Sequence, residues 1–362
     1  MLRPGPCGEA RRPAGLLLTV RSPATIAAGV LALSLFGDSL FYAVLPAHAG
    51  AFGVSGVWLG VLLSVNRFAR LGLYDAIATA FRWGGERRLV VSAAVLATMT
   101  TLLYAIGGLA VLVAARVLWG LAFAVLSLAA LSSAASSRGT IGRDLGVTRA
   151  LSQVGPLVAL GLGSRLVGVT GPRGVFVVMG AITALAIPLA LSLPRTSRKH
   201  PLPSSHRGER VRGPDLILFG LLHLAEAAIL TGLASFLQQG GASVTSVLGD
   251  VALLLVARRL LEVGFGPPIG RIAERLSPRL ILSGIFLIAI AGLVAIAAGL
   301  ALVGAYGLVI SRAALAVAGP LTLVRRKPHD SLRALAAWAT WTETGAAFGP
   351  IVATAAKDIM YN

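Results

Sequence analysis

Cysteine, acidic residues and charge in general are scarce in this sequence. Its 362 residues include one cysteine, Cys7, and 14 Asp and Glu residues, and 13% of all residues are charged. A single cysteine excludes disulfide bonds within the chain and metal sites built from several thiolates. A soluble domain would carry about 25% charged residues, so the composition argues against a soluble fold.

Sequence patterns of nucleotide binding and of hydrolytic enzymes are also absent. The chain has no G-x-x-x-x-G-K-[ST] phosphate loop, which argues against ATP-driven work by this chain alone. It has no H-E-x-x-H, paired-cysteine or G-x-S-x-G pattern either. We therefore expect no enzyme activity, no cofactor and no metal.

Apolar residues dominate what is present. They make up 56% of the chain, and the mean hydropathy is +0.84. They are gathered into runs of about 20 residues, the length of a helix that crosses the hydrocarbon core of a bilayer. Eleven runs are predicted, over residues 24–46, 55–78, 89–108, 110–133, 147–168, 174–194, 214–237, 247–270, 280–299, 303–324 and 332–356. The sequence therefore predicts an all-α polytopic membrane protein.

The formal charge of +18 lies largely in the connections between these runs. One side of the predicted bundle carries 23 Lys and Arg residues, and the other side carries 2. Because basic loops are retained in the cytoplasm, we expect a multi-pass protein of the plasma (cytoplasmic) membrane with a cytoplasmic N-terminus. The basic residues form no stripe interleaved with aromatics, so we expect lipid and no nucleic acid as a partner.

A Pro-, Ser- and Arg-rich segment, residues 195–213, separates six runs from five. It has no apolar periodicity, which is typical of a linker. The predicted organisation is an N-terminal tail (1–23), a six-helix bundle (24–194), the linker (195–213), a five-helix bundle (214–356) and a tail (357–362).

The two bundles carry an internal repeat with an offset near 190 residues. Residues 65–88 align with residues 257–280 without a gap, and Gly155-Pro156 aligns with Gly349-Pro350. Charges within the runs also match, with small shifts in offset: Asp38 with Glu226, and Arg116 with Arg312. Such repeats place a substrate site at their interface in transporters.

Short motifs accompany the repeat. The first run holds Asp38, Tyr42 and Pro46 in a D-x-x-x-Y-x-x-x-P pattern, and the fourth holds Arg116 and Gly120 in an R-x-x-x-G pattern. The eleventh run contains a G-x-x-x-G-P motif, and the stretch after the eighth run is similar to a G-x-x-x-D-R-x-G-R-R loop. Their residues are Gly345, Gly349 and Pro350, and then Gly270, Glu274, Arg275 and Arg279.

Together these motifs resemble the major facilitator superfamily, from residue 24 to about 356. The resemblance implies two half-bundles that rock about a central site, with the stretch from Gly270 to Arg279 as a gating loop. The G-x-x-x-G-P motif is similar to that of the family's proton antiporters, whose fifth-helix copy is represented here by Gly155-Pro156.

The chain also departs from the family pattern. The gating loop of the first half reads Phe81-Arg-Trp-Gly84, without the acid and the leading glycine, so its salt bridge would need Asp75 or Glu86 as a substitute. Leu151 replaces the first glycine of the antiporter motif, and no twelfth apolar run follows the eleventh.

Seven arginines lie within the apolar runs and more than two residues from either end of a run: Arg67, Arg70, Arg116, Arg165, Arg258, Arg259 and Arg312. At bilayer depth each costs several kcal/mol unless it faces a partner or a wet cavity. For Arg67 and Arg70 with Asn66, and for Arg258 and Arg259 with Glu262, two interpretations stand. They form a cationic cavity for an anionic group, or a network that pins helices to carboxylates such as Glu262 and Asp75.

Acidic side chains within the runs are the candidates for proton coupling. Asp38 either exchanges protons or contacts substrate, or it forms a static ion pair with Arg116; Glu226, one helical turn after His223, has the same alternatives. Glu343 is a further candidate for a cation or a proton. The arginine surplus favours an organic anion or zwitterion as substrate, with a lipophilic drug as the alternative.

For Gly155-Pro156 and Gly349-Pro350 we expect helix bends or tight helix contacts. The function predicted from the sequence is a secondary active transporter that moves a small solute by alternating access, as proton-coupled export. The alternative is a receptor or assembly subunit that has kept a transporter fold without transporting.

Overall fold

The computed structural model describes residues 22–54, 57–136, 140–195, 213–239 and 243–361. These residues are almost entirely helical. The first half contains α1 (Pro23–Ala47), η1 (Ala49–Phe52), α2 (Val57–Arg70), α3 (Leu73–Gly84), α4 (Glu86–Ile106), α5 (Leu109–Ala135), α6 (Ile141–Ala184) and α7 (Ala186–Leu191). The second half contains α8 (Gly213–Gln239), α9 (Val244–Arg275), α10 (Pro278–Ala297), α11 (Ala301–Arg326), η2 (Pro328–Asp330) and α12 (Ser331–Tyr361).

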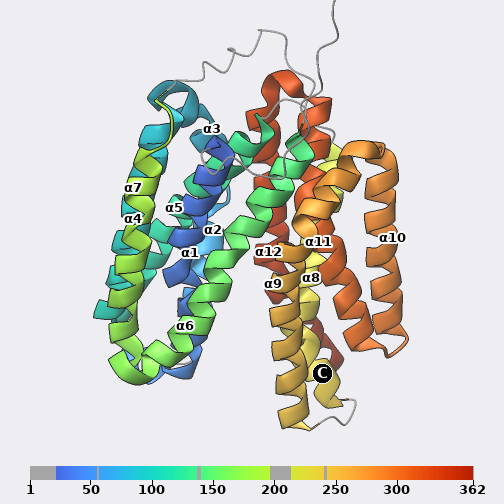
Figure 1. The fold of residues 1–362 in the computed structure, drawn as a ribbon. Helices are drawn as coiled ribbons and strands as arrows, with labels where there is room; N and C mark the ends of the chain where they lie inside the picture. The colour runs from blue at the N-terminus through green and yellow to red at the C-terminus, as the bar shows by residue number, and fades with distance from the viewer. Residues whose placement is uncertain (1–21, 55–56, 137–139, 196–212, 240–242, 362) are drawn as a thin grey trace, which may run out of the picture.

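The two halves form adjacent bundles, blue to green and yellow to red in Figure 1. Most of the predicted linker and nearly all of the predicted N-terminal tail lie outside the described residues. The C-terminal ends of α3, α9 and α11 lie at the top of Figure 1, and Arg82, Arg275 and Arg325 belong to their last turns. We call this end of the molecule the basic end. The other end carries the turns at Gly108 and Gly299, and we call it the opposite end.

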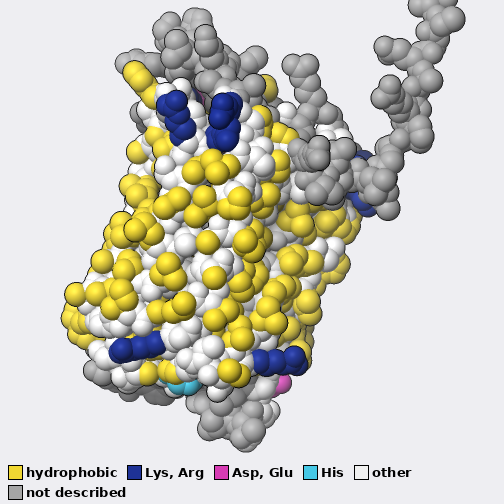
Figure 2. Space-filling view, turned by 60° about the vertical axis from the view of Figure 1, so that its left-hand side comes forward, with side chains coloured by type: hydrophobic (Ala, Val, Ile, Leu, Met, Phe, Trp, Pro, Cys, Tyr) yellow, Lys and Arg dark blue, Asp and Glu magenta, His cyan; other side chains and the backbone are white. Residues whose placement is uncertain are grey.

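Eight helical segments in the described part of the chain are long and apolar enough to cross a membrane. The other three predicted runs lie on α2 with α3, on α9 and on α12. The face in Figure 2 is apolar over its middle, and its charged side chains lie towards the two ends. This is the surface that a bilayer requires, because charged groups are costly within the hydrocarbon layer.

Local sequence sets several helix boundaries. The Ser22 side chain accepts a hydrogen bond from the Thr25 backbone N–H at 3.1 Å, and Pro23 occupies the first turn of α1. The Ser277 hydroxyl does the same for Leu280 at the start of α10, next to Pro278. A serine followed by proline therefore marks the beginning of both helices.

The second predicted run, residues 55–78, is wrong as a continuous helix. It is divided into α2 and α3 at Leu71-Gly72, where Gly72 has φ of 80°, and α3 continues to Gly84. A positive φ is the left-handed conformation that glycine adopts without steric cost, and it interrupts the helix. The break places Arg67 and Arg70 in the last turn of α2.

The buried apolar residues form three clusters that divide along the length of the molecule. The largest cluster draws on both halves, with Tyr74, Phe81 and Trp119 from the first and Phe219 and Trp338 from the second. A second cluster is built from the first half alone, and a third from the second half alone. They contain Phe41, Phe52 and Phe176, and Leu233, Leu254 and Val309, respectively. The halves share one core towards the basic end and have separate cores towards the opposite end.

The predicted Gly-Pro motifs are sites of tight helix contact. A Cβ atom at Gly155 of α6 would lie 2.0 Å from the Ala32 carbonyl oxygen of α1. At Gly345 of α12, a Cβ would lie 2.0 Å from the Gly220 carbonyl oxygen of α8. Gly349 is similarly tight against Ala227. The α-helices continue through Pro156 and Pro350, so the tight-contact interpretation is supported and each half uses it once.

The outer faces of the two halves differ. In the first half, α7 and the end of α6 pack on α1 and α4, as in the contact of Leu189 with Gly29. In the second half, a groove of about 550 Å³ lies among α8, α10 and α11. Its walls are mostly apolar, and Asp215, Arg279 and Arg326 lie at its basic end.

Candidate functional site

The first buried ion pair joins α1 to α5. Arg116 is 0% exposed and pairs with Asp38; its Nε donates to the Leu62 carbonyl at 2.9 Å and its Nη2 to the Tyr42 hydroxyl at 2.7 Å. The Tyr42 hydroxyl donates to the Leu63 carbonyl at 2.9 Å and also lies 3.3 Å from Oδ1 of the buried Asn66. The predicted Asp38–Arg116 pair is therefore present, and Asn66 belongs to it and not to an arginine patch.

The equivalent pair of the second half forms a larger network. Glu226 on α8 lies 2.9 Å from Arg258 on α9 and 3.4 Å from Arg312 on α11. Glu262 is 2% exposed and pairs with Arg312, and it lies 3.9 Å from Arg258 one turn away. Asp38 contacts Arg116 in the first half, and the residues that the repeat matches with them, Glu226 and Arg312, contact each other in the second half.

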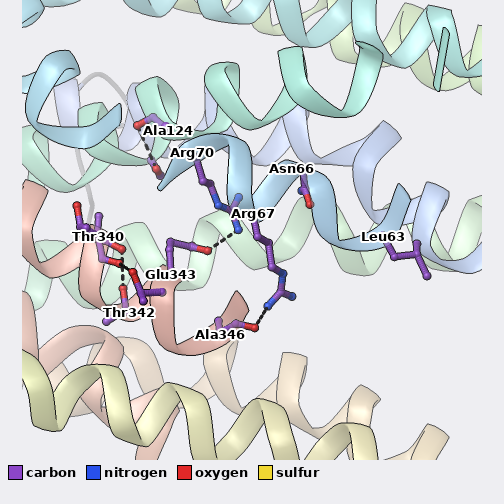
Figure 3. Close-up of polar contacts among 12 residues, drawn as sticks. Leu63, Asn66, Arg67, Arg70, Ala124, Thr340, Thr342, Glu343 and Ala346 are labelled. Atoms are coloured by element: carbon purple, nitrogen blue, oxygen red, sulfur yellow. Dashed lines mark hydrogen bonds and ion pairs between the residues drawn. The ribbon is translucent and has the colours of Figure 1, made fainter. Parts of the chain in front are cut away.

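Two arginines on α2 reach across to α12 in the other half (Figure 3). Arg70 Nη2 lies 2.5 Å from Glu343 Oε2, and Arg67 Nη1 donates to the Ala346 carbonyl oxygen at 2.8 Å. The expected partner Asp75 is exposed and does not take part in this ion pair. Glu343 is therefore a cross-half partner of Arg70.

The helices α6 and α9 make the corresponding cross-half contact. Arg149 Nη2 lies 2.7 Å from Glu262 Oε2, and Arg259 donates to the Gln153 side-chain oxygen. The sequence groups Arg258 or Arg259 with Glu262; Arg258 lies 3.9 Å from Glu262, whereas the hydrogen bond of Arg259 goes to Gln153. Arg149 and Gln153 were not among the predicted site residues, although the repeat aligns Arg149 with Glu343.

At the basic end the halves are joined by close backbone contact. A Cβ atom at Gly270 of α9 would lie 2.1 Å from the Gly142 carbonyl oxygen of α6, and one at Gly146 would lie 2.2 Å from that of Gly266. The Arg143 backbone N–H donates to Glu274 Oε1 at 3.0 Å. The Glu274 carboxylate of α9 therefore lies against the first turn of α6, where the helix dipole favours negative charge.

The predicted gating loop is wrong as a loop. Gly270, Glu274 and Arg275 lie within α9, which ends at Arg275, and Arg279 lies in the first turn of α10. Arg275 and Arg279 are exposed. The Arg325 guanidinium donates to the carbonyl oxygens of Ala273 and Glu274 at the end of α9, at 2.9 and 3.0 Å. This cation satisfies carbonyl groups that the helix itself leaves free.

The altered loop of the first half also joins the two halves. Arg82 on α3 forms an ion pair with Asp330 of η2 at 3.0 Å. Of the expected substitutes, Asp75 is exposed, and Glu86 accepts a hydrogen bond from Ser133 within the first half. The sequence offered no signal for Asp330, apart from its being an acid in a basic connection.

Some predicted residues lie apart from these contacts. Arg165 is exposed and lies near the opposite end. The His223 ring makes a hydrogen bond to its own helix, to the Phe219 carbonyl at 2.9 Å, and packs edge-on against Trp338. The described contacts do not join His223 to Glu226. Among the described residues, no cluster of His, Cys, Asp and Glu suits a metal ion.

The side chains that meet between the two halves carry an excess of positive charge. They come from α2, α6, α8, α9, α11 and α12. Six arginines face three glutamates there: Arg67, Arg70, Arg149, Arg258, Arg259 and Arg312, with Glu226, Glu262 and Glu343. Guanidinium groups suit carboxylate and phosphate, which they bind with two parallel hydrogen bonds. The arrangement can therefore hold an anion and link its binding to the separation of the halves.

Comparison with known proteins gives a consistent result for the fold. The family model of the Major Facilitator Superfamily matches residues 27–350. A solved structure of the E. coli fucose:proton symporter FucP is similar with a TM-score of 0.74, at 13% identity, covering 94% of this chain and 93% of that chain. A structure of FucP in the outward conformation has a TM-score of 0.71, at 13% identity, covering 93% and 91%. The search of curated proteins gives no match.

The family match covers most of the chain, and the fold likeness extends over both halves. The two apolar bundles, their internal repeat and the cross-half contacts agree with it. The chain belongs to the Major Facilitator Superfamily and is a multi-pass membrane transporter protein of that family.

Proposed function

We propose that this protein is a secondary active transporter that moves a small solute by alternating access. The observation that carries the proposal is the division of its core. One apolar cluster is shared by both halves towards the basic end, and separate clusters serve each half towards the opposite end. Two bundles with their own cores can rock against each other about a central site.

The orientation follows from charge. Because basic connections favour the cytoplasm, the basic end faces the cytoplasm of a cell whose plasma membrane holds the protein. The structure then corresponds to a state closed inside.

We further propose that protons drive transport and that the direction is export. Asp38 and Glu226 are carboxylates enclosed with arginines at equivalent places in the two halves. A carboxylate that gives up its arginine partner as the halves move becomes free to take a proton. The similar FucP is described as a proton symporter, which supports the proton but not the direction. Export rests on the antiporter-like Gly345, Gly349 and Pro350.

Reconstitution into vesicles with an imposed pH gradient tests the proposal. Solute flux and the accompanying proton flux are measured for the wild type and for Asp38→Asn. We expect the variant to lose proton-coupled flux by at least tenfold, whereas Asp75→Asn, an exposed carboxylate on α3, keeps it. Thermal unfolding of each variant separates loss of function from loss of fold.

A receptor or assembly subunit would give equal results for both variants and no flux. The first-half loop weighs against this alternative, because Arg82 still reaches Asp330 across the halves despite its altered sequence. Export would be contradicted if the solute moved in the same direction as the protons.

A further inference from the structure

The cross-half contacts are related by the internal repeat, with their charges reversed. Arg70 and Glu262 are equivalent positions, 192 residues apart, and Arg149 and Glu343 are equivalent, 194 residues apart. In the contact between α2 and α12, the first half supplies Arg70 and the second half supplies Glu343. In the contact between α6 and α9, Arg149 pairs with Glu262, so each position carries the opposite charge to its equivalent. In both contacts the arginine lies against a carboxylate, although Glu262 is shared with Arg312.

A second pair of equivalent positions forms no ion pair among the described contacts. Arg67 and Arg259 are 192 residues apart, and both are half-buried. Arg67 donates to the backbone carbonyl of Ala346, and Arg259 donates to the side-chain oxygen of Gln153. Those acceptors lie on equivalent helices at neighbouring positions of the repeat, because Gln153 aligns with Ala347, the residue after Ala346. Each half therefore supplies one arginine whose hydrogen-bond partner across the interface is neutral.

These two arginines account for most of the positive excess at the site. The remaining arginines, Arg70, Arg149, Arg258 and Arg312, all contact carboxylates. An uncompensated guanidinium within a membrane protein is costly, and at such depth it faces the interior or a water-filled cavity and marks a substrate or ion pathway. In Figure 3 the Arg67 side chain turns away from the Arg70–Glu343 pair towards Ala346.

We propose that Arg67 and Arg259 bind the substrate and that it is a small organic dianion, with one anionic end held from each half. The assignment rests on the proposed transport function and adds to it the class of substrate. Both guanidinium groups present two parallel donors, and a carboxylate or phosphate accepts both. A hydrogen bond to a charged acceptor is stronger than one to a carbonyl, so the anion displaces Ala346 and Gln153.

This displacement links binding to movement. The bonds from Arg67 to Ala346 and from Arg259 to Gln153 both cross between the halves. When the dianion takes the two guanidinium groups, these two cross-half bonds are released together. The basic end is then held by fewer contacts, and it opens more readily with substrate bound than without it.

Binding to the purified full chain tests the assignment. The probes are unbranched dicarboxylates from malonate to adipate, with butyrate, a neutral sugar and a lipophilic cation for comparison. We expect at least one dicarboxylate to bind, and Arg67→Gln and Arg259→Gln each to weaken its binding about tenfold or more, because each variant loses a hydrogen bond to a charged group. Arg67→Lys keeps the charge and is expected to retain part of the affinity.

The matched control is Arg165→Gln, an exposed arginine near the opposite end, which is expected to bind like the wild type. The assignment is overturned if no dicarboxylate binds, if butyrate binds as tightly, or if folded Arg67→Gln and Arg259→Gln bind dicarboxylates like the wild type. Flux in vesicles is measured separately. Flux of another solute without dianion binding rejects this site and leaves transport intact, whereas dianion binding without flux rejects transport and leaves the site.

Discussion

Arg116 combines charge, hydrogen bonding and aromatic contact in one enclosed side chain. Its guanidinium contacts Asp38, the Leu62 carbonyl and the Tyr42 hydroxyl, and it lies 5.0 and 4.8 Å from the ring centres of Phe41 and Tyr42. The planar group presents several donors in fixed directions and stacks on aromatic faces. It therefore ties α5 to α1 and α2 at a single point.

We predict that Arg116→Lys destabilises the protein although it preserves the charge. A lysine has one flexible ammonium group, which cannot satisfy the Leu62 carbonyl and the Tyr42 hydroxyl together with Asp38. The loss is expected to approach the cost of breaking a buried pair, about 3 kcal/mol. Thermal unfolding in detergent, followed by tryptophan fluorescence, measures it. Arg165→Lys, at an exposed arginine, provides the control, and equal shifts in the two variants would refute the prediction.

At this scale the sequence predicts the partners within one half better than the partners between halves. The repeat and the motifs led to the Asp38–Arg116 pair, because both residues belong to one bundle. Glu343 is 273 residues from Arg70, and its pairing depends on how two complete bundles dock. No local pattern encodes that docking, so the expected partner Asp75 was wrong.

Among the elements, α6 and α9 form the closest contact between the halves. Gly142 and Gly146 on α6 face Gly270 and Gly266 on α9, with backbone against backbone. Glycines let helices approach closely where the lipid provides no hydrophobic drive for association. Closure of the basic end therefore depends on the absence of side chains at four positions.

We predict that Gly270→Ala shifts the protein towards opening at the basic end. Its Cβ would lie 2.1 Å from the backbone oxygen of Gly142, so closed packing cannot persist unchanged. Overpacking costs about 1–3 kcal/mol, and roughly tenfold faster labelling of a buried cysteine is expected. The reporter is Ser152→Cys, 3% exposed, in a Cys7→Ser background. Gly264→Ala, where a Cβ meets open space, should leave the labelling rate unchanged, and equal rates in both variants would exclude this role.

Helix boundaries could be predicted where proline, serine or a charge cluster marks them, and less well elsewhere. The break between α2 and α3 depends on one glycine, Gly72, in a sequence rich in glycine that is mostly helical. The family motif suggested a loop after residue 270, whereas α9 continues to Arg275 because Glu274 and Arg325 supply contacts there. A tertiary contact thus accompanies the end of α9, and the positive φ of one glycine accompanies the break between α2 and α3.

For the whole molecule, the class of fold followed from hydropathy and the repeat alone. Runs of apolar residues predict the membrane helices, and the matched charges of the repeat predict two related halves. The state in which those halves meet could not be predicted, because the proposed alternating access would form and break the same contacts. The structure supplies that information through one shared cluster and two separate ones.

The separate cores at the opposite end, together with a chain that has only one cysteine, make the protein suited to distance measurement by spin labelling. In a Cys7→Ser background, labels at the exposed Ala51 of the first half and Leu300 of the second lie at that end. Because each half keeps its own packed cluster there, the label separation reports the angle between two rigid bodies. We predict that a bound dicarboxylate shortens this distance and that Arg67→Gln abolishes the change. An unchanged distance with ligand bound would mean that binding and rocking are not coupled.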